Sequence, residues 1–249
     1  MADRGSSADR ARESVETTVA DGVCQLRAPG SRWLVTGHDG GYRDADVAYN
    51  VSVPEGFDRT DLSAYAAERR ERAGFDTAGP TLLTGVDATH ARGARSGSVT
   101  VVATAGVSNP AALPVLAGSA SEYDEVPEVH DDRVAGTVNL LVWTDRALAD
   151  GALATLLGVV VEAKTATLRS RTGFPGTTTD AAVVGCAPDG ESTAFAGSAT
   201  PVGAATRACV REAVSASLEA RYADAELPGS VREADYGVAT TRRASVFEL

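Results

Sequence analysis

The amino-acid sequence predicts a single α+β domain in which a mixed or mainly antiparallel sheet is layered with helices. Short segments of strand character outnumber the helical ones, and they do not alternate strictly with helices as in a parallel α/β fold. No linker rich in Pro, Gly or Ser divides the middle of the chain, and no repeat of solenoid length is visible. Of the 249 residues, 43% are hydrophobic, which is enough to bury one sizeable core.

The N-terminal segment differs in composition from the rest of the chain. Residues 1–18 are polar and charged and hold few large apolar side chains, so we expect a disordered tail. The segment lacks the apolar stretch of a secretory signal, and no run approaches the roughly 20 apolar residues that span a bilayer. We therefore expect a folded domain over residues 19–249 and a cytoplasmic location.

Strands are predicted where β-branched residues cluster or where apolar and polar residues alternate. These segments are residues 22–27, 32–36, 47–53, 80–85, 98–105, 137–143, 179–186, 193–197 and, in the C-terminal tail, 244–247. The glycines within residues 37–41 indicate a turn between the second and third strands. Residues 119–133 carry many acidic side chains and are predicted to form a surface loop.

Helices are predicted where apolar residues recur every three or four positions. The predicted helices span about residues 61–73, 145–170 and 201–222, and a short fourth one follows Pro110. Thr60 and Asp145 are the expected N-caps of the first two helices, and Gly74 ends the first. Thr200 followed by proline is a typical helix start, because proline fits the first helical position.

The charge composition restricts the class of partner. The formal net charge is -11, from 34 acidic and 23 basic residues. Such a surface repels nucleic acids and anionic membranes, so neither is an expected partner, whereas a homo-oligomer is compatible with it. Lys164 is the only lysine, and every other basic residue is an arginine. Excess carboxylates with almost no lysine are typical of salt-adapted proteins, although a GC-rich genome also favours arginine.

Neither cysteine nor histidine spacing supports a metal site. The three cysteines, Cys24, Cys186 and Cys209, are far apart and are predicted to be buried thiols. The three histidines, His38, His90 and His130, lack the spacing of metal ligands. The motifs of G-x-S-x-G hydrolases, zincins, P-loop proteins and dinucleotide-binding proteins are also absent from the sequence.

Lys164 falls on the apolar stripe of the long predicted helix. It continues the helical spacing of Leu153, Leu157 and Val160, so its amine is expected to be desolvated, or paired with a carboxylate or a ligand. The alternative is a lysine at the edge of the core face that extends its amine to water. Because the chain uses arginine everywhere else, a compact ammonium at this position favours a functional role.

Glu162 lies two positions before Lys164 and points to a different side of the helix, so the two cannot form a local pair. If both are catalytic, each needs a partner from another loop. The expected partners are Thr177–Asp180 and Ser108–Asn109. A solvent-exposed carboxylate near Arg169 is the alternative for Glu162.

Three loops rich in glycine, hydroxyl and amide groups are candidate binding segments. Residues 173–180 offer backbone N–H donors, three hydroxyls and a carboxylate. Residues 104–109 end an apolar strand, and Asn109 is suited to donate to an oxyanion. Residues 197–203 open a helix, whose N-terminal N–H groups favour an anionic or amide oxygen. Ordinary turn formation and helix capping are the alternative for each loop.

Five short segments form a recognisable series. In chain order they are Thr104-Ala-Gly-Val-Ser-Asn109, Gly136-Thr-Val-Asn139-Leu, Glu162-Ala-Lys-Thr165, Gly176-Thr-Thr-Thr-Asp180 and Ala196-Gly-Ser-Ala-Thr200-Pro-Val-Gly203. Together they resemble the adenosylcobinamide amidohydrolase family of corrinoid-salvage enzymes, in the family's order, across about residues 30–221. Two features depart from the family pattern: residues 119–133 resemble an insertion, and Val161 stands where a threonine is expected.

The resemblance implies a reaction and a substrate. Residues 19–249 would form an amidohydrolase domain that cleaves the amide between aminopropanol and a propionate of the corrin ring. Adenosylcobinamide would give adenosylcobyric acid and 1-amino-2-propanol, in cobinamide salvage for cobalamin biosynthesis. The corrinoid is the small-molecule substrate, and neither a separate cofactor nor a metal is expected.

The chemistry of amide cleavage leads to a hypothesis for the roles of individual residues. The expected catalytic residues are Lys164, Glu162, Asp180, Thr178 and Asn109. Lys164 would do electrostatic or acid–base work, Glu162 or Asp180 would orient or deprotonate the attacking group, and Asn109 would bind the oxyanion with backbone N–H groups of residues 177–179. A nucleophilic Thr178 or Ser108 stays open, although no adjacent base is visible. The expected substrate-binding residues are Thr104, Gly106, Ser108, Asn139, Gly176, Thr177, Thr179, Gly197 and Thr200.

Three other functions are compatible with the sequence. The first is a corrinoid-binding or remodelling protein that does not hydrolyse its ligand. The second is a hydrolase for a different amide. The third is a structural or assembly protein, which predicts that Glu162 and Lys164 are exposed or paired at an interface, with no pocket between the loops.

Overall fold

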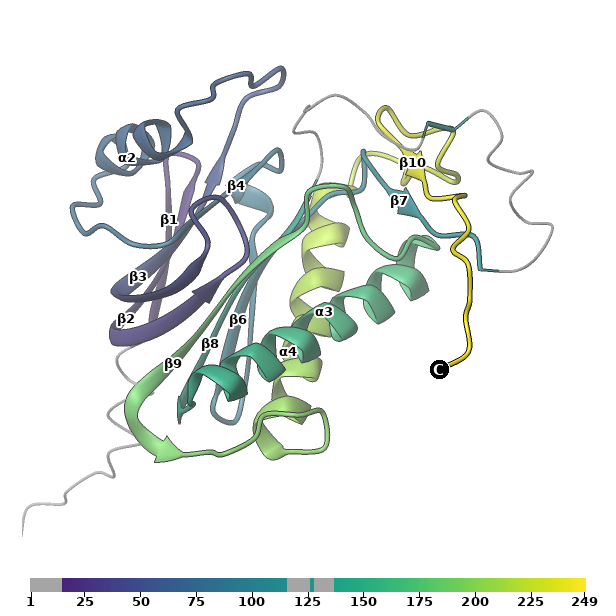
Figure 1. Ribbon diagram of the computed structural model, residues 1–249. Helices are drawn as coiled ribbons and strands as arrows, with labels where there is room; N and C mark the ends of the chain where they lie inside the picture. Colours follow the sequence, from purple (N-terminus) through teal and green to yellow (C-terminus); the bar gives the residue numbers. More distant parts are fainter. Residues whose placement is uncertain (1–14, 116–125, 128–136) are drawn as a thin grey trace, which may run out of the picture.

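The computed structural model describes residues 15–115, 126–127 and 137–249. At its centre lies one sheet with the strand order β4-β3-β2-β9-β8-β6-β5, and β1 pairs with β2 (Figure 1). Its strands are β1 (Glu16–Ala20), β2 (Val23–Val35), β3 (Gly41–Ser52), β4 (Thr81–Thr84), β5 (Arg92–Ser96), β6 (Val99–Ala105), β8 (Val138–Ala147) and β9 (Ala181–Ser192). The pairs β3–β4 and β8–β9 are parallel and the others are antiparallel. The predicted single α+β domain with a mixed, mainly antiparallel sheet is confirmed.

Helices lie on the outside of both halves of this sheet (Figure 1). They are α2 (Leu62–Arg72), the 3₁₀ turn η1 (Ala88–His90), α3 (Asp150–Thr172) and α4 (Pro201–Arg221). α3 and α4 pack on β6, β8 and β9 in the largest core, whereas α2 packs on β2 and β3 in a separate one. Successive side chains of β8 point to opposite faces of the sheet, which explains this layering. Leu140 and Val142 face α3 and α4, whereas Leu141 and Trp143 face the other way.

The sheet folds over itself, so that β2, β3 and β4 face β6, β8 and β9 across a third core. An irregularity between Arg27 and Ser31 interrupts the register of β2 with β3, and such bulges bend strands. Trp33 fills this core and lies flat against Gly185 of β9. A Cβ at Gly185 would come within 2.2 Å of the Trp33 ring, so only glycine permits this packing.

The long helix α3 is anchored to the sheet near its first turn. Arg32 of β2 donates two hydrogen bonds to Asp150, at 2.8 and 3.1 Å, and this guanidinium holds the pKa of the Asp150 carboxyl below its usual range. The other end of α3 stops at Gly173, which adopts a left-handed conformation with φ 81° and donates its N–H to the Arg169 carbonyl. These two anchors fix where the face of α3 that carries Lys164 meets the sheet.

Two helix predictions were wrong at their N-termini. Asp145 lies in β8, which continues to Ala147 because its pairing with β9 extends that far, and α3 starts at Asp150 without a side-chain cap. The cap of α2 is Asp61 rather than Thr60, again without a side-chain bond. The Thr200 cap of α4 is confirmed, since its Oγ1 accepts the Gly203 N–H at 3.1 Å.

Several predicted segments near the ends of the chain also differ. Residues 22–27 and 32–36 are parts of one strand, and no strand is found over residues 193–197 or 244–247, which are all described. The short helix expected after Pro110 was wrong: β7 (Ala111–Ala112) pairs there with β10 (Val238–Ala239) in a small parallel sheet. Strand β1 begins at Glu16, inside the tail expected over residues 1–18. Residues 1–14, and residues 119–133 except 126 and 127, lie outside the described residues.

Helix α3 is also long and apolar enough to cross a bilayer by length and composition alone, with a mean hydropathy of 1.4 in its most apolar window. Half of that window is buried inside the protein, against β9 and α4. One such helix is weak evidence for a membrane span, because helices of protein cores meet the same criterion.

Candidate functional site

The single lysine forms a buried ion pair. Lys164 Nζ on α3 contacts Asp180 Oδ2, which lies in the loop immediately before β9. The two side chains are 10% and 12% exposed, so both charges are largely removed from water. Of the two loops expected to supply a partner, residues 177–180 and residues 108–109, the first supplies the partner of Lys164.

Asp180 is held by donors from three different segments. Besides Lys164, its Oδ1 accepts the Val138 N–H at 2.9 Å and the Thr177 hydroxyl, and its Oδ2 accepts the Thr177 N–H at 3.1 Å. These hydrogen bonds fix the orientation of the carboxylate. The carboxylate therefore joins α3, the start of β8 and the start of β9 at one end of the sheet.

Gly176 is the residue that lets the loop approach this ion pair. A Cβ at this position would lie 2.9 Å from Asp180 Oδ2 and 3.4 Å from Lys164 Nζ. The φ of Gly176 lies outside the left-handed region, so the reason for glycine here is space rather than backbone conformation.

Asn109 joins the second loop to the first. Its Nδ2 donates to the Thr178 and Thr179 hydroxyls at 2.7 and 3.2 Å, and its main-chain carbonyl accepts the Thr178 N–H at 3.1 Å. Asn109 is fully buried, and its Oδ1 has no hydrogen-bond partner among the described residues. A buried polar atom without a hydrogen bond is costly, and this amide oxygen lies where the two loops meet. Thr178 as a residue is exposed, and its hydroxyl is bonded to the buried Asn109 amide.

A row of buried polar side chains supports the same end of the sheet from inside. Asn50 Nδ2 donates to Thr104 Oγ1 at 2.8 Å, and Asn139 Nδ2 donates to Asn50 Oδ1 at 2.9 Å. Thr137 Oγ1 donates to the Thr179 carbonyl at 2.7 Å, which links the row to the 177–180 loop. All four side chains are 3% exposed or less. Thr104 and Asn139, predicted to bind substrate, therefore lie in the interior and act as structural supports.

The sequence reasoning missed Asn50 and Thr137. Asn50 stands alone among apolar neighbours in a strand, and Thr137 opens the next buried strand. A polar side chain at such a position needs a partner, which is a signal that a sequence can show. The sequence does not show which partners these are: Asn139, 89 residues from Asn50, and the Thr179 carbonyl, 42 residues from Thr137.

Glu162 does not belong to this cluster. Its side chain is 58% exposed and pairs with Arg207 of α4 on the outer surface of the two helices. Glu162 and Lys164 point to different sides of α3, as predicted. Glu162 pairs with Arg207 and not with residues 177–180 or 108–109. The structure therefore corrects its predicted catalytic position.

Gly197 and Thr200 also lie away from the ion pair. They precede α4, which follows the far end of β9, whereas Asp180 precedes the near end of the same strand (Figure 1). Thr200 Oγ1 donates to the Gly197 carbonyl at 2.8 Å and caps α4. The capping alternative, not substrate binding, accounts for both residues.

Gly106 and Ser108 are tied into the cluster through their backbones. The Gly106 N–H donates to the Thr137 carbonyl at 3.1 Å, and the Ser108 carbonyl accepts the Tyr236 N–H at 3.1 Å. The adjacent pairing of Pro110 with Thr177 joins the two loops directly. The C-terminal segment around β10 thus buttresses the Asn109 loop.

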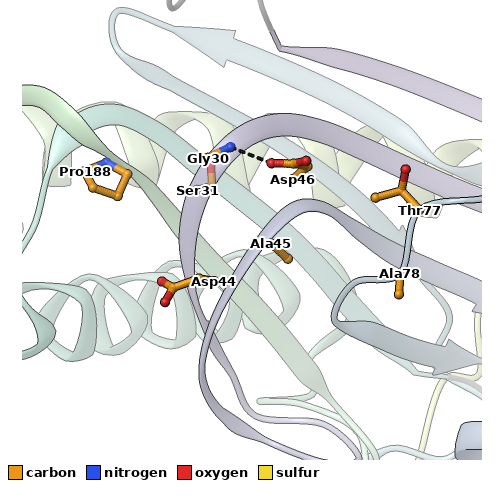
Figure 2. A pocket seen from close by; sticks show the side chains of 8 residues that line it. All are labelled: Gly30, Ser31, Asp44, Ala45, Asp46, Thr77, Ala78 and Pro188. Atoms are coloured by element: carbon orange, nitrogen blue, oxygen red, sulfur yellow. Dashed lines mark hydrogen bonds between the residues drawn. The ribbon is translucent and has the colours of Figure 1, made fainter.

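A large surface hollow of about 540 Å³ lies elsewhere, beside the β2–β3 hairpin. Figure 2 shows its lining, in which Asp44 and Asp46 are the charged residues. Asp46 is already engaged, because its Oδ1 accepts the Gly30 N–H at 2.7 Å in the bend of β2 (Figure 2). No residue of the Lys164–Asp180 cluster lines this hollow.

The cysteines are inert in this arrangement. All three are free and buried, and burial raises the pKa of the Cys24 thiol to about 12. Among the described residues, no group of three or more His, Cys, Asp or Glu side chains is arranged to hold a metal ion.

Comparison with known proteins assigns the chain to a family. The family model for adenosylcobinamide amidohydrolase matches residues 7–226. The chain belongs to the adenosylcobinamide amidohydrolase family. The adenosylcobinamide amidohydrolase of Halobacterium salinarum is 52% identical over 237 residues, covering 93% of this chain and 98% of that protein. The one from Methanosarcina mazei is 29% identical over 196 residues, covering 75% of this chain and 89% of that protein.

The family match extends over the entire cluster around Lys164 and Asp180. The resemblance found in the sequence is thereby confirmed.

Proposed function

We propose that this adenosylcobinamide amidohydrolase homologue cleaves the amide between aminopropanol and the corrin propionate of adenosylcobinamide. Water adds its oxygen to the carbonyl carbon, the C–N bond breaks, and the leaving nitrogen takes a proton. The products are adenosylcobyric acid and 1-amino-2-propanol. The observation that carries the proposal is the buried Lys164–Asp180 pair within the family-matched region.

The cluster contains the groups that amide hydrolysis requires. An amide is a poor electrophile, so the site must deprotonate the attacking water, stabilise an oxyanion and protonate the amine. Asp180 is the carboxylate placed to accept the proton from water. The Lys164 ammonium supplies positive charge for the oxyanion and a proton for the leaving amine. The Thr178 hydroxyl, which accepts a hydrogen bond from the buried Asn109 amide, is the candidate in this cluster for contact with the scissile amide.

The test is hydrolysis of adenosylcobinamide followed by mass spectrometry of adenosylcobyric acid and aminopropanol. We expect Lys164→Ala, Lys164→Arg and Asp180→Asn each to lower kcat by about 10²–10⁴, the usual contribution of an acid or base. Glu162→Gln is the matched control on the same helix and should keep wild-type activity, because its side chain is exposed.

Loss of one partner of a buried ion pair also destabilises the fold, by about 3–5 kcal/mol. Thermal unfolding of each variant, together with the double variant Lys164→Gln/Asp180→Asn, separates loss of chemistry from loss of structure. A folded, fully active Lys164→Ala and Lys164→Arg would remove the lysine from the mechanism. Absence of aminopropanol with the wild type would favour a corrinoid-binding protein without hydrolysis.

The family membership and the composition also support a proposal for the pathway, the cellular location and the cofactor requirement of the reaction. We infer that the enzyme acts in cobinamide salvage for cobalamin biosynthesis, in the cytoplasm of a salt-adapted cell, with the corrinoid as substrate and no separate cofactor. The net charge of -11 with one lysine supports salt adaptation. Activity that disappears on treatment with EDTA would contradict a metal-free reaction, and cell fractionation tests the location.

A further inference from the structure

A second cavity, of about 360 Å³, lies between α2 and the starts of β3 and β4, and no residue of the Lys164–Asp180 cluster lines it. Its charged or titratable lining residues are His38, Asp39, Arg43, Asp44 and Arg70, and its floor includes small residues such as Ala67. A volume of this size lies within the range of small-molecule sites. The α2 side of the sheet is visible in Figure 1, away from α3 and α4.

Four of these five side chains already have partners. Arg43 pairs with Asp39 at 2.7 Å, and Asp44 pairs with Arg32 at 3.3 Å. His38 shares a 2.8 Å hydrogen bond with the Ser63 hydroxyl. The two carboxylates of the lining are therefore committed to arginines other than Arg70.

Arg70 is the exception. Among the ion pairs of the described chain its side chain is the least exposed arginine, at 16%. Its guanidinium has five N–H donors, yet the one hydrogen bond it makes within the described part of the chain is a long contact of 3.4 Å from Nη2 to Glu71, whose side chain is 68% exposed. The Nε atom of Arg70 is buried and has no hydrogen-bond partner among the described residues.

A largely buried guanidinium with unused donors is costly unless an acceptor meets it. Arginine presents its donors as a planar fork, which matches the paired oxygens of a carboxylate or phosphate group. We propose that this cavity binds the oxyanion group of a small ligand, held by Arg70. The cavity shares no lining residue with the Lys164–Asp180 cluster, so the proposed anion site uses other residues than those assigned to amide hydrolysis.

Isothermal titration of the full-length protein with inorganic phosphate and, separately, with acetate tests the proposal at constant ionic strength in potassium chloride. Wild-type protein should bind at least one of these anions saturably, and the comparison shows whether phosphate or carboxylate fits the cavity. Arg70→Gln should weaken that binding at least tenfold. Arg70→Lys should fall between the two, because lysine keeps the charge and loses the fork.

Arg72→Gln is the matched control, since Arg72 lies on the same helix, is 62% exposed and pairs with Asp21. It should bind the anion as the wild type does. Ala67→Leu fills the cavity without removing the charge, and it should also abolish binding, which keeps the test valid if Arg70→Gln does not fold. No saturable binding of either anion, or unchanged affinity in folded Arg70→Gln or Ala67→Leu, would overturn the proposal.

Discussion

At the scale of single residues, the candidate site depends on how tightly neighbours fit around one ion pair. Lys164 and Asp180 are both about nine-tenths buried, and Gly176 passes beside them with no room for a side chain. The carboxylate receives four donors, so its position is fixed more strictly than that of an exposed acid. A small displacement of this loop should therefore affect catalysis more than stability.

Gly176→Ala tests this expectation. The added Cβ would lie 2.9 Å from Asp180 Oδ2, closer than such atoms normally approach, so the carboxylate or the loop must move. We expect kcat to fall at least tenfold, since misplacement by a fraction of an ångström is costly in catalysis. Kinetics with adenosylcobinamide measure the effect.

Gly158→Ala is the control for that variant. Gly158 is exposed in the middle of α3, with nothing within 4 Å of an added Cβ. Alanine there should stabilise the protein by about 0.5–1 kcal/mol and leave kcat unchanged. Equal activity of Gly176→Ala and the wild type would contradict the tight fit at the ion pair.

At the scale of elements, α3 and α4 have different tasks. α3 brings Lys164 to the loop end of the sheet, and its start is fixed by Arg32 and its end by Gly173. α4 begins at the other end of the sheet, where Thr200 caps it and Gly203 permits a close approach to the Gly197 carbonyl. The conspicuous sequence of residues 196–203 is therefore explained by helix initiation.

Thr200→Ala should separate these two tasks. Loss of the cap should lower the free energy of unfolding by about 1 kcal/mol, because the Gly203 N–H loses its acceptor. Activity should not change, since the cap is remote from Lys164. Chemical denaturation and kinetics measure both quantities. Ser198→Ala, at an exposed neighbour in the same loop, should alter neither, and an inactive but folded Thr200→Ala would return this loop to the substrate site.

At the scale of the whole molecule, charge dominates the expected response to solution conditions. A formal net charge of -11 on 249 residues makes the compact state repel itself at low ionic strength. Salt screens this repulsion, and the Debye length falls to roughly 3 Å at 1 M.

We therefore expect the thermal unfolding midpoint to rise between about 0.1 and 1 M potassium chloride and to change less above that range, where the screening length is already short. Scanning calorimetry over a salt series measures the effect. A midpoint that is independent of salt, or that falls, would contradict salt adaptation of the fold.

The sequence alone determined the local features of this protein. The strand and helix types, the turn at residues 37–41, the Thr200 cap and the burial of Lys164 follow from short-range patterns, because backbone preference and hydrophobic spacing act within a few residues. The family was also visible in the sequence, since five short segments keep their order along the chain.

Only the tertiary structure decided which loops meet. The choice of Asp180 as the Lys164 partner, the exclusion of Glu162 and the Asn50–Asn139 contact all depend on how the sheet folds over itself. Strand order and curvature arise from packing between residues far apart in the sequence, and local spacing does not encode them. The lysine was therefore identifiable from composition and periodicity, whereas its chemistry depends on a carboxylate that the fold brings to it.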